Sequence, residues 1–280
     1  MLTKFQKELM PLLMSMRSER SYFAGGSILN FSLPRCSSDF DIFHDDHTAC
    51  TKSFITDVDM LRQNGYQVDI LRTPEKHGIG EVVVSKFDDS GQSPSGVTQI
   101  QWATDSAYRF FPIEYDKHLG FCLNYHDLAT NKILALAGRA EIRDYYDVCE
   151  MIQMGKPVTA YIWAACSKDP GYTPNSLLDY MSMNSKYRTE EFSNIYTSGK
   201  LLDVVQCKNL FQSMMHKARK QFSYAPIDEY GSLYLRKTDL SVFFPDKNDF
   251  ESKNYIRHEA RPFGAVPEFH NHIESKQIRR

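Results

Sequence analysis

An alternation of acidic and apolar side chains from Asp39 to Phe43 restricts the fold of this chain more than any other segment. Residues two apart on a strand point to the same face of a sheet. The pattern therefore predicts a half-buried strand in which Phe40 and Ile42 face the core. The carboxylates of Asp39 and Asp41 would then lie side by side on the opposite face.

The segments around this strand predict an N-terminal half that mixes helices and strands. Apolar residues recur at helical spacing in 1–20, and Gly65 follows a second helical segment. The stretch 88–96 is rich in Ser, Gly and Asp and predicts a surface hairpin loop. We expect helices at 1–20, before Pro34 and at 48–64, and strands at 22–24, 67–72, 81–87 and 98–102.

From His126 onward the pattern becomes helical, with a later hairpin and an irregular tail. We expect helices at 127–137, 141–154, 158–167, 174–184 and 200–222, a hairpin formed by 232–236 and 240–244, and irregular chain after Arg261. The predicted fold class is α+β, with a mixed sheet flanked by helices. We expect an α/β domain at 1–125 and a mainly helical domain at 126–280.

Composition and charge exclude several classes of protein. The 280 residues are 42% hydrophobic, which is too apolar for a disordered chain. A formal net charge of -2 argues against a surface that is basic throughout, as a protein coating DNA would need. No apolar run approaches the roughly 20 residues that span a bilayer, and 1–20 lacks a signal-peptide core. The 6 cysteines are scattered without a CxxC pair, which favours a reduced, cytoplasmic protein without structural zinc.

Two adjacent carboxylates repel each other, and each raises the pKa of the other. A hard divalent cation removes this conflict, and Mg²⁺ prefers carboxylate and phosphate oxygens. The turn Gly25-Gly26-Ser27 precedes a short predicted helix and would expose backbone N–H groups suited to a phosphate. We therefore expect a site for Mg²⁺ and a nucleotide. The alternative is a solvent-facing strand beside an ordinary turn.

The same residues resemble a known family. The pattern GGS…SSDFDIF is similar to the signature of DNA polymerase β-like nucleotidyltransferases. The segments DLATNKILALAGR (127–139) and RDYYD (143–147) resemble the AbiEii/MenT toxin family within that superfamily. The resemblance covers roughly residues 20–155, and it implies a nucleotidyltransferase-like fold for the sheet domain.

The resemblance implies transfer of a nucleoside monophosphate from an NTP to an acceptor, with Mg²⁺ as cofactor. Many members of the family are toxins of toxin–antitoxin or phage-defence systems and some modify tRNA, which implies an RNA acceptor and an antitoxin partner but no membrane. The implied catalytic residues are Asp39, Asp41, Lys132, Asp144 and Asp147, with Asp39 and Asp41 as metal ligands. The implied nucleotide-binding residues are Gly25, Gly26, Ser27, Ser38 and Lys132. As the alternative, Arg139 and Arg143 could pair with Asp144 and Asp147 in a purely structural helix contact.

One departure from the polymerase-like pattern concerns a third carboxylate, which usually lies on a neighbouring central strand. The candidate strand here has Gln99 and Gln101 at the matching positions, and glutamine cannot replace a charged metal ligand. Glu81 or Asp105 could substitute. Three functions stay open: transfer to RNA, transfer to a small molecule or a protein hydroxyl, and nucleotide or partner binding without catalysis.

Four further motifs have a structural interpretation beside a functional one. His44-Asp45-Asp46-His47 is more typical of a polar turn that caps a helix than of a metal cluster. His270-Asn271-His272 is expected to be solvated. The segment 108–112 could stack a base or form the edge of the core. The basic cluster 216–220 could bind an RNA backbone or simply complement a helix C-terminus.

Overall fold

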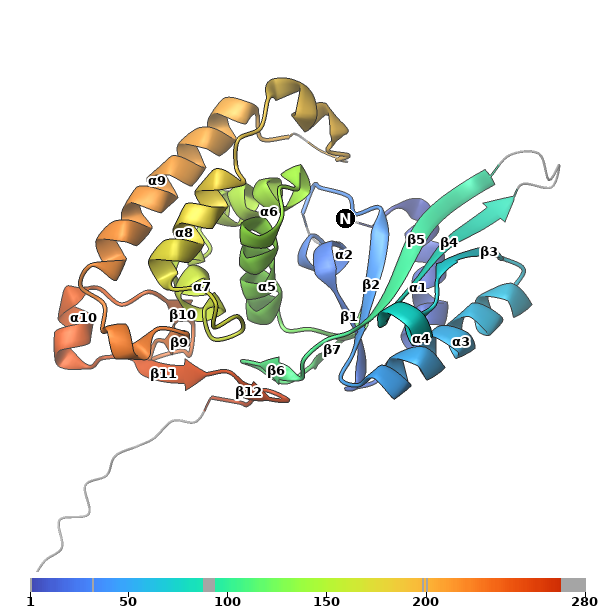
Figure 1. Cartoon of the computed structure of the whole chain (residues 1–280), viewed down its shortest axis with the longest axis horizontal. Helices are drawn as coiled ribbons and strands as arrows, with labels where there is room; N and C mark the ends of the chain where they lie inside the picture. The colour runs from blue at the N-terminus through green and yellow to red at the C-terminus, as the bar shows by residue number, and fades with distance from the viewer. Residues whose placement is uncertain (1, 32, 88–93, 198, 200, 268–280) are drawn as a thin grey trace, which may run out of the picture.

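The computed structural model describes residues 2–31, 33–87, 94–197, 199 and 201–267. The fold is α+β, as expected, and its centre is a mixed seven-stranded sheet with the strand order β3-β4-β5-β2-β1-β8-β7 (Figure 1). The strands of this sheet are β1 (Ser21–Ala24), β2 (Asp39–His44), β3 (Gln67–Arg72), β4 (Ile79–Phe87), β5 (Pro94–Thr104), β7 (Glu114–Asp116) and β8 (Gly120–Cys122).

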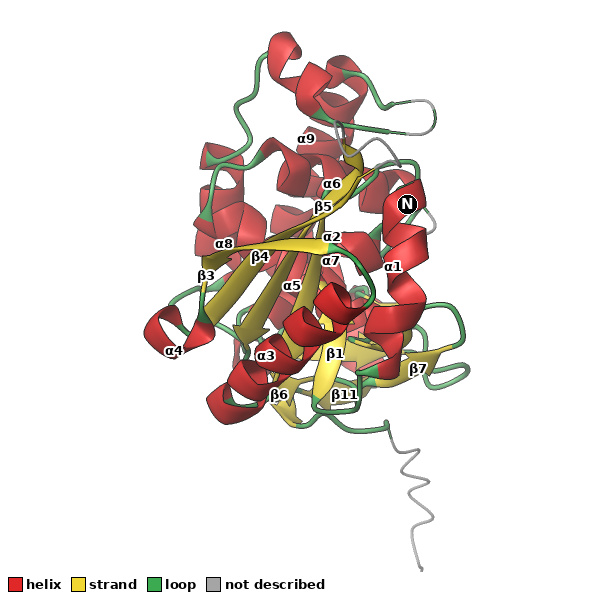
Figure 2. Ribbon diagram, turned by 90° about the vertical axis from the view of Figure 1, so that its right-hand side faces the viewer, coloured by secondary structure: helices red, strands yellow, loops and turns green. Residues whose placement is uncertain are grey.

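Two helices, α1 (Lys4–Ser15) and α3 (His47–Gln63), cover one face of the sheet (Figure 2). Phe40 and Ile42 of β2 are fully buried, as the alternation predicts. On the same face, Phe54 of α3 packs edge-to-face against Trp102 of β5 with ring centroids 5.2 Å apart. This apolar layer fixes β2 so that its acidic residues point the other way.

Strand β2 runs parallel to β5 and antiparallel to β1. In this register Asp39 lies beside Gln99, and Asp41 lies beside Gln101. Glu81 of β4 lies on the far side of Gln101. Side chains in register on neighbouring strands share a face, so the polar residues of three strands line up on the face opposite α1 and α3.

Helices of the second half lie across that polar face. Helix α5 (Tyr125–Gly138) packs against α2 (Gly25–Leu29), which itself contacts β2. Besides α1 and α3, the helices are α2 (Gly25–Leu29), α4 (Pro74–His77), α5 (Tyr125–Gly138), α6 (Ile142–Gln153), α7 (Val158–Ala165), α8 (Pro174–Met183), α9 (Val204–Phe222) and α10 (Lys247–Ser252), with 3-10 turns η1 (Thr189–Asn194) and η2 (Ile227–Glu229).

Two small sheets complete the fold. Strands β9 (Ser232–Leu235) and β10 (Val242–Phe243) form the expected late hairpin, and β11 (Ile256–Glu259) adds a third strand that the sequence pattern does not predict. The tail after Arg261 is not wholly irregular, because β12 (Arg261–Pro262) pairs with β6 (Tyr108–Arg109). Residues 270–272 lie outside the described residues.

Two other expectations need correction. Residues 94–96 belong to β5 rather than to a loop, because they pair with the end of β4. The sequence pattern also does not predict the short strands β6, β7 and β8. Strand β8 runs parallel to β1 within the large sheet, which its three residues alone do not reveal. Among the described residues, there is no helix long and apolar enough to cross a membrane.

Candidate active site

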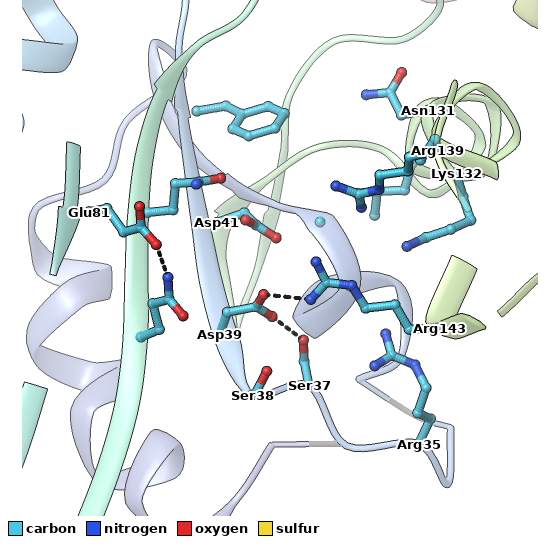
Figure 3. Close-up of a pocket in the computed structure, with 17 residues that line it drawn as sticks. Arg35, Ser37, Ser38, Asp39, Asp41, Glu81, Asn131, Lys132, Arg139 and Arg143 are labelled. Carbon is cyan, nitrogen blue, oxygen red and sulfur yellow. Dashed lines mark hydrogen bonds and ion pairs between the residues drawn. The ribbon is translucent and has the colours of Figure 1, made fainter. Parts of the chain in front are cut away.

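A cavity of about 380 Å³ lies between the polar face of the sheet and helices α5 and α6 (Figure 3). Carboxylates project into it from the strands, and cationic side chains face them from the helices and from the segment before β2. The charged residues lining the cavity are Asp39, Asp41, Glu81, Arg35, Lys132, Arg139 and Arg143. Phe43, Leu128 and Ala135 add apolar surface to its wall.

Asp39 and Asp41 both point into the cavity, as the alternation predicts. Asp39 accepts a hydrogen bond from the Ser37 hydroxyl at 2.5 Å, and its other oxygen lies 3.1 Å from Nη1 of Arg143. Burial, together with the charge of Asp39, raises the pKa of Asp41 to about 7. A cation bound beside Asp41 would favour its ionised form and lower this pKa.

Gly25 forms the wall next to Asp41. Its φ of +70° is in the left-handed region, and a Cβ at this position would lie 1.6 Å from Oδ2 of Asp41. Gly26 also lines the cavity, and a Cβ there would lie 2.7 Å from Nη2 of Arg35. Ser27 does not line the cavity: it is fully buried, and its hydroxyl has no hydrogen-bond partner in the described part of the chain. Ser38 does line it.

Lys132 reaches the cavity from α5 and is anchored by two carboxylates of α6. Its ammonium lies 2.6 Å from Asp144 and 3.1 Å from Asp147. Burial disfavours the charged amine, but Asp147 and Asp144 outweigh this effect and raise the pKa of Lys132. Lys132 is therefore a fixed positive charge in the cavity wall.

The structure does not place Asp144 and Asp147 in the cavity wall, although the resemblance implies a catalytic role for both. Both are fully buried on α6. Asp144 also accepts a hydrogen bond from Arg139 at 2.8 Å, and Asp147 accepts one from Arg35 at 2.9 Å. The two carboxylates thus hold three of the cations that line the cavity. Arg143, which the structural alternative pairs with Asp144 or Asp147, pairs with Asp39 instead.

Glu81 is the candidate third carboxylate that lines the cavity, and Asp105 is not among the lining residues. Glu81 accepts a hydrogen bond from Gln99 and lies 3.1 Å from Arg72. Gln99 and Gln101 both line the cavity, between Glu81 and the two aspartates. Sequence reasoning missed Arg35 and Asn131 as cavity residues, because an arginine before a strand and an asparagine within a helix give no signal of their own.

Contacts favour the structural interpretation for two of the weaker motifs, 44–47 and 108–112, and give only the position of a third. In 44–47, Asp46 caps α3 by accepting from Ala49 N–H at 2.7 Å, and Asp45 pairs with Arg109 at 2.8 Å. Phe110 is fully buried, which fits the core-edge interpretation of 108–112. The basic cluster 216–220 occupies the last turns of α9.

The cavity residues fit a divalent cation bound together with a polyphosphate. In the described parts of the chain, no three His, Cys, Asp or Glu side chains converge on one point. A cation held by Asp39 and Asp41 would therefore take its other ligands from phosphate oxygens and water, as Mg²⁺ commonly does. The missing Cβ of Gly25 leaves room at the oxygens of Asp41, where such an ion would bind.

No family model and no curated protein match the sequence. Among solved structures, the chain is similar to MenT4, a nucleotidyltransferase toxin from Mycobacterium tuberculosis H37Rv. That match has 13% identity and a TM-score of 0.44, and covers 76% of this chain and 89% of the other. It is also similar to Cid1, an RNA terminal uridylyl transferase, with 10% identity and a TM-score of 0.29 over 95% of this chain and 80% of the other.

Proposed function

We propose that this protein is a nucleotidyltransferase that transfers a nucleoside monophosphate from an NTP to a hydroxyl of an acceptor. One observation supports this most strongly: Asp39 and Asp41 face four cations across a single cavity. The cations are Arg35, Lys132, Arg139 and Arg143. A metal-bound triphosphate needs both kinds of partner, since carboxylates hold its metal and cations neutralise its remaining charge.

We assign the NTP to the cavity with its triphosphate between the two walls. Lys132 and Arg139 would bind phosphate oxygens from α5, and the bare backbone at Gly25 and Gly26 would allow close approach. Phe43 and Leu128 offer apolar surface for the base. A divalent ion held by Asp39 and Asp41 would supply charge neutralisation at the reacting phosphate.

The reaction is an in-line displacement at the α-phosphorus. The acceptor oxygen forms a bond to this phosphorus, and the bond from the phosphorus to the oxygen that bridges it to the β-phosphate breaks. Pyrophosphate leaves with that electron pair, and the proton of the acceptor hydroxyl passes through water to Glu81. Positive charge from Lys132 and Arg139 stabilises the charge that develops on the leaving group.

The roles of the buried carboxylates follow from their contacts. Asp144 holds Lys132 and Arg139, and Asp147 holds Lys132 and Arg35. We therefore assign Asp144 and Asp147 as positioning residues rather than as groups that touch substrate. Cations fixed in advance lose little freedom when the triphosphate binds, which is the basis of electrostatic preorganisation.

We further propose that the acceptor is RNA, including tRNA, and that the protein is a cytoplasmic toxin of the AbiEii/MenT type with an antitoxin partner. The motif resemblance at 127–139 and 143–147 supports this finer assignment. It also supports a nucleotidyltransferase domain at 1–125 and a helical domain at 126–280. Expression of the wild-type chain should then arrest bacterial growth, and Asp41→Ala should relieve the arrest.

The direct test is incubation with each α-labelled NTP, Mg²⁺ and total RNA. The proposal expects label in RNA with one or more NTPs, and chelation of the metal should abolish it. Parallel reactions contain cell protein or small hydroxyl compounds instead of RNA. Label confined to one of those acceptors would overturn the RNA assignment and leave nucleotidyl transfer standing. No label in any acceptor would overturn the proposed activity.

A further inference from the structure

A second cavity, of about 650 Å³, adjoins the first. The residues that line both cavities are Arg35, Ser37, Ser38 and Arg143. Ser37 and Ser38 directly precede Asp39, so the two cavities meet beside the first of the two aspartates. Neither Asp39 nor Asp41 lines the second cavity, and the charged residues that do are Arg35, Arg143 and Glu141.

An exposed aromatic ring stands at the wall of this second cavity. Tyr196 is 69% exposed, and it makes no ring–ring contact with the described residues. Its backbone is nevertheless fixed, because its carbonyl accepts from Cys36 N–H at 2.9 Å and Thr197 forms a β-bridge with Arg35. Ile195, which precedes it, is buried. The backbone that carries the ring is thus tied to the segment that leads into Asp39.

Cations and an exposed aromatic ring on a fixed backbone are the elements with which proteins bind single-stranded nucleic acid. Cations contact the backbone phosphates, and a base stacks on the ring without sequence preference. A small hydroxyl compound would need neither the ring nor a second cavity of this size. The chemistry of the cavity therefore favours an acceptor that presents a base and a phosphate.

The position of the cavity agrees with the geometry of the reaction. In-line displacement requires the acceptor to approach the α-phosphorus from the side opposite to the leaving pyrophosphate. Gly25, Lys132 and Arg139 line only the first cavity, whereas Tyr196 and Asn194 line only the second. The two cavities thus provide separate places for triphosphate and acceptor, which share a boundary at Ser37 and Ser38.

We infer that the second cavity binds the terminal nucleotide of a single-stranded RNA acceptor, with its base stacked on Tyr196 and its phosphate at Arg143. This inference rests on the proposed function and adds the acceptor subsite to it. Tyr196 is assigned as an acceptor-binding residue and has no part in binding the NTP. Removal of the Tyr196 ring should weaken the binding of RNA and leave the binding of NTP unchanged.

The test compares Tyr196→Ala, Tyr196→Phe and Tyr115→Ala. Tyr115 is 68% exposed and lies outside both cavities, so it is a matched control. With RNA as acceptor, Tyr196→Ala should raise the KM for RNA by about 5- to 150-fold, the range that corresponds to loss of one base–aromatic stack. The KM for NTP should stay within about twofold. Tyr196→Phe retains the ring and should behave as wild type, as should Tyr115→Ala.

Binding without turnover separates this inference from the proposed activity. The affinity of a fluorescein-labelled single-stranded RNA is measured by anisotropy for the same three variants and for the wild-type protein. Weaker RNA binding by Tyr196→Ala alone supports the subsite even if no transfer is detected. Transfer to RNA that is equally efficient in Tyr196→Ala and Tyr115→Ala would overturn the inference while the proposed function stands. An equal rise in the KM for NTP and for RNA would also overturn it.

Discussion

Of the two glycines in the wall of the candidate active site, Gly25 has the tighter surroundings. Its left-handed backbone would cost any other residue about 1–2 kcal/mol, and a Cβ would overlap the carboxylate of Asp41. Gly65 has a similar φ of +82°, but a Cβ there would have nothing within 4 Å, so Gly65→Ala tests the backbone cost alone.

We predict that Gly25→Ala lowers the rate of nucleotidyl transfer by at least about a hundredfold, because Asp41 must move away from the position of the metal. Gly65→Ala should lose only the backbone cost of about 1–2 kcal/mol and keep its activity. Transfer rates and thermal unfolding of both variants check this prediction. Equal activity in the two variants would show that the contact with Asp41 is unimportant.

Arg143 pairs with Asp39 in this structure and would have to give up that contact when a metal ion binds. We therefore predict that Arg143→Gln binds Mg²⁺ more tightly than the wild-type protein in the absence of NTP. The same variant should have a lower kcat/KM, because a cation is missing from both cavities. Titration calorimetry with Mg²⁺ and steady-state kinetics measure the two effects. Weaker Mg²⁺ binding by Arg143→Gln would contradict the expectation that Arg143 and Mg²⁺ compete for Asp39.

The sequence alone predicts part of this site at the residue scale. Asp39 and Asp41 are predicted from a local alternation, because a half-buried strand fixes where its side chains point. The involvement of Arg35 depends on a contact with Asp147 across 112 positions of the chain, which no local pattern contains. Ser27 is the opposite case. The motif predicts that it binds the nucleotide, but the residue is fully buried and does not line the cavity.

At the scale of elements, ion pairs between buried groups join α5, α6 and the segment before β2. Asp147 has a fully buried side chain and contacts both Lys132 and Arg35. Loss of its charge would leave two largely buried cations with one carboxylate fewer. Such a loss costs far more than the same change at the surface, because the interior does not screen the remaining charges.

We predict that Asp147→Asn lowers the free energy of unfolding by about 3 kcal/mol. Asp179→Asn removes the partner of Arg219 in an exposed pair and should change it by less than about 1 kcal/mol. Urea denaturation of both variants measures the difference. Equal effects would mean that the buried pairs are well screened and have no special role in fixing the cations.

For elements with strong local periodicity, the bounds predicted from the sequence are close to those in the structure. Short paired strands are not predicted. The sequence predicts a helix at 127–137, and helix α5 spans Tyr125–Gly138. Strands β6 and β12 have two residues each and form only because distant parts of the chain meet. The same limit applies to Glu81, whose place beside the aspartates depends on the strand order β4-β5-β2.

For the whole molecule, buried histidines make stability depend on pH. Burial lowers the pKa of His44 to about 4, and that of His126 to about 4. An unfolded histidine has a pKa of about 6.5, so the unfolded chain binds more protons between these values. The stabilising contribution of each neutral histidine is therefore present above about pH 6.5 and is lost as the pH falls toward 4. Asp41 has the opposite effect. Its raised pKa makes the folded protein bind more protons than the unfolded chain, so its contribution to stability falls as the pH rises toward 7.

Replacing His44 by glutamine separates the histidine's contribution to the pH dependence of stability from that of Asp41. We predict that the unfolding free energy of the wild-type protein falls more steeply than that of His44→Gln between pH 6.5 and pH 5, by up to about 1.4 kcal/mol per pH unit. Chemical denaturation at several pH values measures both slopes. Parallel slopes would show that His44 titrates in the folded protein as it does in the unfolded chain.

The central claim is that Asp39 and Asp41 form the metal–nucleotide site of a nucleotidyltransferase. It is tested most directly by the rate of transfer from an α-labelled NTP to RNA in wild type, Asp39→Ala and Asp41→Ala. Each substitution should reduce the rate by at least about a thousandfold, equivalent to about 4 kcal/mol in the barrier, with the fold intact by circular dichroism. A rate within about tenfold of wild type in either variant would contradict the assignment.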